Sequence, residues 1–172
     1  MAHLTLVLGG ARSGKSARAL ALAEAAAAPA ARVFVATAEA LDDEMADRIA
    51  RHKAERGAGW ALVECPLDLP DAVSAQSAAG RVLLIDCLTL WLSNLMHHER
   101  APEAAAASLL AAIADAPGGV IAVSNEVGMG LAPTNALGRA FRDAQGRLNQ
   151  QVAAAADRVE FVAAGLPLAL KG

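Results

Sequence analysis

The chain has 172 residues, enough for one domain with a sizeable core, and its 55% hydrophobic and 19% charged residues exclude a disordered protein. Its formal net charge of −3 gives no basic field that would attract nucleic acid or an anionic membrane, and 3% aromatic residues are too few for a base-stacking surface. No apolar run is long enough to span a bilayer, and the N-terminus lacks a signal-peptide pattern, so we expect a cytoplasmic protein.

Apolar runs bounded by turn residues alternate with helical patterns along the chain. Strands are expected at 4–8, 33–36, 60–64, 81–87, 120–124 and 159–163, and helices at 16–27, 42–56, 69–75, 88–97, 102–115 and 135–156. The strand at 60–64 is expected at a sheet edge and antiparallel, and residues 166–171 are a candidate for one more strand. This alternation predicts an α/β fold with a mostly parallel central sheet and helices on both faces. No linker divides the chain, so we predict a single domain over residues 1–172.

The first predicted strand runs directly into the sequence GGARSGKS. It matches the pattern G-x-x-x-x-G-K-[ST] of a phosphate-binding loop, in the strand–loop–helix context that this motif requires. The glycines let backbone N–H groups converge on phosphate oxygens, and the helix that follows adds the positive end of its dipole. The predicted nucleotide-binding residues of the loop are Gly9, Gly10, Ala11, Arg12, Ser13, Gly14, Lys15 and Ser16. A glycine-rich turn without a ligand is the alternative.

Asp86 ends the apolar run VLLID. In phosphate-loop proteins an acid at the end of such a strand lies beside the loop's Ser or Thr and helps to hold Mg²⁺, which here pairs Asp86 with Ser16. The alternative is an aspartate that caps the helix expected from residue 88. Cys65 and Cys87 form no Cys-x-x-Cys motif, so we expect buried free thiols and no zinc site.

His52 is the histidine with the most informative neighbours. Helical spacing places it in a patch with Arg48, Lys53 and Arg56, which would lower the pKa of its imidazole and keep the ring neutral for attack on phosphorus. A solvent-facing histidine on a charged helix is the alternative. Further along the chain, Glu126 lies in the segment SNEVGMG after a core strand, where it is a candidate to contact substrate. The alternative is that Glu126 is only a polar residue of a glycine-containing loop.

Four segments in order resemble one known family. They are GGARSGKS, VFVATAEALDDEMADRIARHKAERGAGW, VLLIDCLTLWLSNL and VSNEVGMGLAPTNALGRAFRDAQGRLNQ, and together they span nearly the whole chain. The family is the bifunctional adenosylcobinamide kinase and adenosylcobinamide-phosphate guanylyltransferase of cobalamin biosynthesis. The blocks around His52 and Glu126 are more specific than the phosphate loop itself.

The resemblance implies a RecA-like P-loop NTPase fold, ATP or GTP as phosphate donor, a corrinoid substrate and a homotrimer. It implies phosphorylation of adenosylcobinamide and transfer of GMP from GTP to its phosphate, through a GMP–histidine at His52, giving adenosylcobinamide-GDP and pyrophosphate. Besides the loop, the nucleotide contacts that it implies are Ala36, Thr37, Ala38, Lys53, Ala54, Glu55, Arg56, Glu64 and Asp86. The alternatives are a P-loop small-molecule kinase without nucleotidyl transfer and a non-catalytic nucleotide-binding switch.

Overall fold

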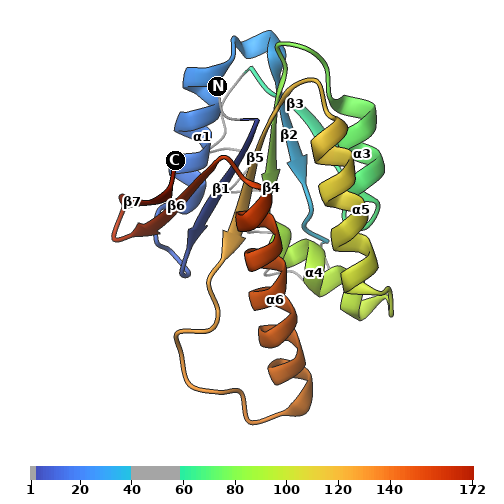
Figure 1. The fold of residues 1–172 in the computed structure, drawn as a ribbon, viewed down its shortest axis with the longest axis vertical. Helices are drawn as coiled ribbons and strands as arrows, with labels where there is room; N and C mark the ends of the chain where they lie inside the picture. Colours follow the sequence, from blue (N-terminus) through green and yellow to red (C-terminus); the bar gives the residue numbers. More distant parts are fainter. Residues whose placement is uncertain (1–2, 40–58) are drawn as a thin grey trace.

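The computed structural model of the protein describes residues 3–39 and 59–172, and the helix expected over 42–56 lies outside them. The described residues form a seven-stranded sheet in the order β3-β2-β4-β5-β1-β6-β7 (Figure 1). The strands are β1 (Leu4–Gly9), β2 (Arg32–Ala36), β3 (Ala61–Glu64), β4 (Val82–Asp86), β5 (Gly119–Asn125), β6 (Arg158–Ala163) and β7 (Leu166–Lys171).

Neighbouring strands from β3 to β6 all run parallel, and only β7 is antiparallel, to β6. The prediction of an antiparallel strand at 60–64 was therefore wrong. β3 does lie at the edge, but it is parallel to β2, with Ala61 opposite Val33 and Glu64 opposite Ala36. The apolar pattern of a short strand carries no information on its direction, whereas the chain between Ala36 and Ala61 is long enough for the crossover that a parallel pair requires.

The described helices lie on both faces of the sheet (Figure 1). α1 packs against β1, β4, β5 and β6 on one face, and α4 and α6 lie on the other face with α3 and α5. No described helix is both long and apolar enough to cross a membrane. The helices are α1 (Lys15–Ala26), α3 (Leu69–Gln76), α4 (Leu88–His97), α5 (Pro102–Asp115) and α6 (Ala136–Ala155), with a 3₁₀ turn at Pro29–Ala31.

Alternation along each strand divides the apolar core into two layers. In β1, Leu4 and Leu6 face the layer under α3 to α6, whereas Val7 faces the layer under α1. The α1 layer is built around Ala19 and Ala23, whose small side chains let the helix approach the sheet closely. The loop between Gly9 and Lys15 joins β1 to α1, so this close packing fixes both of its ends.

Candidate nucleotide-binding site

The register of the parallel strands brings several predicted site residues to one edge of the sheet. Asp86 pairs with Ala36, and Ala36 pairs in turn with Glu64, so three strand ends form one row. Gly9 ends β1 opposite Asn125 of β5. In an open sheet of parallel strands, ligands bind in the crevice beyond these carboxyl ends.

The phosphate loop leaves β1 at Gly9 with no room for a side chain. A Cβ atom there would collide with the Ser13 hydroxyl and would lie 2.6 Å from the Val162 carbonyl oxygen. Gly14 precedes α1 with a φ of 95°, a left-handed conformation that favours glycine. The loop is therefore tightly folded on its own backbone, as close approach to phosphate requires.

Lys15 is the first residue of α1, and its side chain turns back over the loop. The residue is only 9% exposed, and its Nζ donates a hydrogen bond to the Gly10 carbonyl at 3.2 Å. This position encloses the ammonium group at the N-terminus of the helix, where the dipole and the charge favour the same anion. The Ser13 hydroxyl, in contrast to the Lys15 ammonium group, has no hydrogen-bond partner among the described residues; it is buried and faces Gly9.

Asp86 is held at the end of β4 by a fully buried threonine. The Thr37 hydroxyl donates to the Cys87 carbonyl at 2.7 Å and accepts from the Cys87 N–H at 2.9 Å. The Thr37 N–H also donates to the Asp86 carbonyl at 3.3 Å, and the Asp86–Cys87 peptide bond is cis. The Thr37 hydroxyl thus positions the peptide that carries Asp86, and the predicted contact of Thr37 with nucleotide stays a prediction.

Lys15 and Asp86 come from elements that pack together, because α1 begins with Lys15 and packs against β4, which ends at Asp86. The pKa of the Cys87 thiol is raised to about 11, chiefly by burial and also by the negative charge of Asp86, whereas the positive charge of Lys15 opposes this shift. Both charges therefore act on one buried sulfur. Cys65 is also buried, and both cysteines are free thiols, as the sequence predicts.

The residues at this position fit a magnesium ion that is shared with phosphate. Ser16, in the first turn of α1, offers a hydroxyl, and Asp86 offers a carboxylate at the end of the strand against which α1 packs. No group of three or more His, Cys, Asp or Glu that would cage a metal by itself exists among residues 3–39 and 59–172. Mg²⁺ is commonly held by one or two carboxylates together with substrate phosphates, so this sparse donor set suits it.

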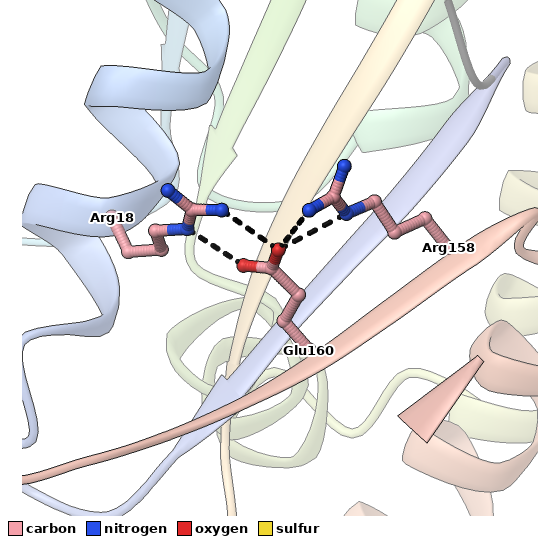
Figure 2. Close-up of polar contacts among 3 residues, drawn as sticks. All are labelled: Arg18, Arg158 and Glu160. Atoms are coloured by element: carbon pink, nitrogen blue, oxygen red, sulfur yellow. Dashed lines mark hydrogen bonds and ion pairs between the residues drawn. The ribbon is translucent and has the colours of Figure 1, made fainter. Parts of the chain in front are cut away.

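A buried carboxylate anchors α1 to the sheet. Figure 2 shows Glu160 of β6 between Arg18 of α1 and Arg158. Arg18 donates from Nε to one carboxylate oxygen at 2.8 Å and from an Nη to the other at 2.9 Å. Glu160 is only 2% exposed, and the guanidinium groups lower the pKa of its carboxyl. This ion pair fixes α1 one turn beyond Lys15.

The structure does not bring Glu64 to the loop. Glu64 is exposed on the edge strand, four strand positions from β1, or about 19 Å at the usual spacing between strands. The Glu126 carboxylate accepts from the Gly128 N–H in its own loop. His52, Lys53, Ala54, Glu55 and Arg56 lie outside the described residues, so their roles stay predictions.

A cluster of three amide side chains at the site was not predicted from the sequence. Asn125 ends β5 beside Gly9, and Gln145 and Asn149 of α6 reach the same strand end as buried amides. Their four-residue spacing on one helix face was the available signal, because a polar pair on the inner face of an amphipathic helix needs buried partners.

Comparisons with known proteins agree with this geometry. Residues 5–170 match the family model described as cobinamide kinase / cobinamide phosphate guanyltransferase. The chain is 46% identical to the bifunctional adenosylcobalamin biosynthesis protein CobP of Pseudomonas aeruginosa, over 97% of this chain and 96% of the relative. It is 41% identical to the corresponding protein CobU of Salmonella typhimurium, over 98% of this chain and 99% of the relative.

Solved structures support the fold alone. The flagellar accessory protein FlaH of Methanocaldococcus jannaschii superposes with a TM-score of 0.53 at 13% identity, over 98% of this chain and 77% of that one. The P4 protein of bacteriophage phi6, solved with ADP, gives a TM-score of 0.51 at 18% identity, over 96% of this chain and 52% of that one. The predicted RecA-like P-loop fold is confirmed.

Proposed function

The chain belongs to the family of cobinamide kinases / cobinamide phosphate guanyltransferases, and on this premise we propose that one triphosphate site, built on the phosphate loop, serves both of its reactions. It is an enzyme of cobalamin biosynthesis with kinase and guanylyltransferase activity. The observation that carries the shared site is the position of Lys15 over the phosphate loop at the N-terminus of α1, a helix that packs against the strand ending at Asp86.

In the kinase reaction, the loop from Gly9 to Ser16 holds the phosphates of ATP or GTP through its backbone N–H groups. Lys15 contacts the β- and γ-phosphates and neutralises charge that develops as the terminal phosphoryl group leaves. Ser16 and Asp86 would hold Mg²⁺, which supplies further charge neutralisation when bound. The hydroxyl oxygen of adenosylcobinamide forms the new bond to the γ-phosphorus, the bond from this phosphorus to the bridging oxygen breaks, and the nucleoside diphosphate leaves.

In the guanylyl reaction, a nitrogen of the His52 imidazole forms a bond to the α-phosphorus of GTP, and pyrophosphate leaves. The phosphate of adenosylcobinamide phosphate then attacks the same phosphorus, the nitrogen–phosphorus bond breaks, and adenosylcobinamide-GDP forms. The family resemblance supports His52 in this role, and its cationic neighbours Lys53 and Arg56 favour a neutral, nucleophilic imidazole. Two displacements at one phosphorus let a single phosphate-binding apparatus serve both halves of the transfer.

Mass spectrometry of the intact protein after incubation with GTP tests this proposal. We expect a mass increase of one GMP in the wild type and none in His52→Ala, which should keep much of its kinase activity. His97→Ala is the matched control, because His97 is an exposed histidine at the end of α4 and is not a predicted site residue. Persistent labelling of His52→Ala would assign the nucleophile to another residue. An unlabelled wild type would favour the alternative function, a kinase without nucleotidyl transfer.

We further propose that the chain works as a homotrimer in the cytoplasm. The exposed face of β7 supports self-association, since Leu166, Leu168 and Leu170 are 73%, 62% and 58% exposed on one side of an edge strand. Native mass spectrometry should show three chains per particle. Leu168→Lys should weaken the assembly if β7 lies in the interface, and a trimer that survives this change would place the contact elsewhere.

A further inference from the structure

Asn125 occupies a central position at the site that the proposed mechanism has not used. It ends β5, the strand that lies between β1 with its phosphate loop and β4 with Asp86. In register, Asn125 is opposite Gly9, and the next residue, Glu126, donates its N–H to the Gly9 carbonyl at 3.1 Å. The Asn125 backbone is therefore one strand spacing, about 4.8 Å, from the start of the loop.

Strand alternation turns the Asn125 side chain toward the nucleotide face. Val123, two residues earlier in β5, packs in the core layer under α1, and Val123 is also the register partner of Asp86. Ser124 points to the opposite face, where it meets α6. Asn125 and Asp86 consequently lie on the same side of the sheet, the side from which α1 presents Lys15.

The backbone of Asn125 is fixed from both sides by side chains. Its N–H donates to the Thr89 hydroxyl at 2.8 Å, and its carbonyl accepts from the Asn149 amide at 3.0 Å. Behind it, the fully buried Gln145 donates to the Ser124 hydroxyl and to Asn149, both at 2.9 Å. These shared partners restrain the end of β5, although the Gln145 Oε1 atom has no hydrogen-bond partner among the described residues.

The side chain that this network holds in place is itself incompletely satisfied. The Asn125 Oδ1 atom is buried and has no hydrogen-bond partner among residues 3–39 and 59–172. An unpaired buried acceptor is unfavourable and uncommon in folded proteins, so its position at a strand end beside a phosphate loop points to a partner that arrives with the ligands. The missing partner must donate a hydrogen bond, which phosphate oxygens cannot do and a substrate hydroxyl can.

We infer that Asn125 is a catalytic residue of the kinase reaction, in which Oδ1 accepts a hydrogen bond from the attacking hydroxyl of the substrate and aligns its oxygen with the γ-phosphorus. This inference rests on the proposed function of the loop. The substrate oxygen forms the new bond, the bond from the γ-phosphorus to the bridging oxygen breaks, and its electron pair leaves with the nucleoside diphosphate. The hydroxyl proton passes to a non-bridging oxygen of the transferred phosphoryl group.

The guanylyl reaction makes no such demand. Its proposed nucleophiles, a neutral imidazole and then a phosphate, bring no hydroxyl to the γ-phosphorus. Asn125 is therefore expected to separate the two activities of the enzyme, whereas the loop residues serve both. Gln145 and Asn149 act as positioning residues, because they reach the reaction only through the end of β5.

The test compares Asn125→Ala with wild type in three assays on the full-length protein. These are kinase kcat and KM with adenosylcobinamide, affinity for a non-hydrolysable ATP analogue by calorimetry, and the rate of GMP incorporation from GTP. We expect kinase kcat to fall about tenfold to a hundredfold, the range that lost alignment of a reacting atom produces. Analogue affinity and GMP incorporation should stay within about threefold, and the latter also shows that the variant is folded.

Two further variants sharpen the test. Asn125→Asp keeps an acceptor oxygen in the same place and should retain more kinase kcat at saturating nucleotide than Asn125→Ala. Asn135→Ala is the matched control, since the Asn135 side chain only caps α6 by accepting from the Gly138 N–H at 2.6 Å.

Kinase kcat that is unchanged in Asn125→Ala, or equal losses in the Ala and Asp variants, would overturn the acceptor role. Parallel loss of both activities and of analogue affinity would also overturn it, in favour of a structural role. Failure of the proposed function would show differently, as absence of kinase activity or of GMP incorporation in the wild type.

Discussion

The Gly165 N–H donates a hydrogen bond to the Ser13 carbonyl at 2.8 Å and so joins the turn between β6 and β7 to the phosphate loop. The contact is close, because a Cβ on Gly14 would lie 3.0 Å from the Gly165 Cα atom. The turn reaches this position because β6 is the parallel neighbour of β1 and ends beside it. Ala164 and Gly165 both have positive φ values, of 50° and 79°, which suits the tight two-residue turns that connect antiparallel strands. The loop is thus supported from outside its own motif.

Gly14→Ala should abolish tight nucleotide binding. The new methyl group would push the turn at Gly165 away from the loop and would strain a residue whose φ is 95°. We expect affinity for ATP and GTP, measured by calorimetry, to fall more than tenfold. Gly80→Ala is the matched control, because Gly80 has a φ of 78° but open space where its Cβ would lie. Equal binding losses in the two variants would mean that general destabilisation, not the loop contact, is responsible.

Lys15→Ala should impair both reactions together. The ammonium group lies at the N-terminus of α1 over the Gly10 carbonyl, where a triphosphate would meet it in either reaction. We expect kcat/KM of the kinase and the rate of GMP incorporation each to fall at least a hundredfold. The matched variant is Lys171→Ala, whose Nζ donates to the Ala154 carbonyl at 3.0 Å near the end of α6, away from the loop. Guanylyl transfer at normal rate in Lys15→Ala would require a second nucleotide site.

The Glu160 carboxylate should make stability depend on pH in the acid range. Hydrogen bonds from Arg18 lower its pKa below the ordinary value of 4.5, with Arg158 acting in the same direction. Below about pH 4.5 the unfolded chain therefore binds more protons than the folded one. The contribution of Glu160 is complete above that pH and is lost as the pH falls through its lowered folded pKa.

Glu160→Gln should remove this contribution and flatten the pH dependence. We expect the free energy of unfolding at pH 7 to fall by about 2–3 kcal/mol, since glutamine removes the negative charge and replaces one of the two acceptor oxygens with an NH₂ group that faces guanidinium donors. Urea denaturation between pH 3 and 7 measures both effects. Glu103→Gln is the control, because Glu103 is 66% exposed and its 3.5 Å pair with Arg147 is a surface one. An unaltered pH dependence in Glu160→Gln would assign the acid sensitivity to other carboxylates.

Thr37→Val should destabilise the end of β4. Valine keeps the shape of threonine but leaves the Cys87 N–H and carbonyl without the hydroxyl that pairs with both. We expect a loss of about 1–3 kcal/mol in unfolding free energy, because the position is fully buried. Thr37→Ser retains the hydroxyl and should lose less. If the valine variant were as stable as the serine variant, these hydrogen bonds would contribute nothing measurable.

Much of the fold could be predicted from the pattern of the chain. Apolar runs such as VLLID and the helical stretch that follows each of them predict alternating strands and helices, which leaves few topologies other than a mostly parallel sheet. The direction of β3 could not be predicted, because a short run of apolar residues looks the same in both directions. The structural role of Thr37 was also hidden, since its partner Cys87 is fifty residues away in the sequence.

By itself, the sequence determined the phosphate loop and its chemistry. GGARSGKS is a local motif, and the conformation that its glycines allow follows from adjacent residues alone. Only the tertiary structure decided which distant groups meet that loop. Asp86 and Asn125 reach it through strand order and register, whereas Glu64 is carried to the far edge by the same sheet. The physical reason is that hydrogen bonding between strands joins residues by their place in the sheet, and this place depends on the packing of the whole chain.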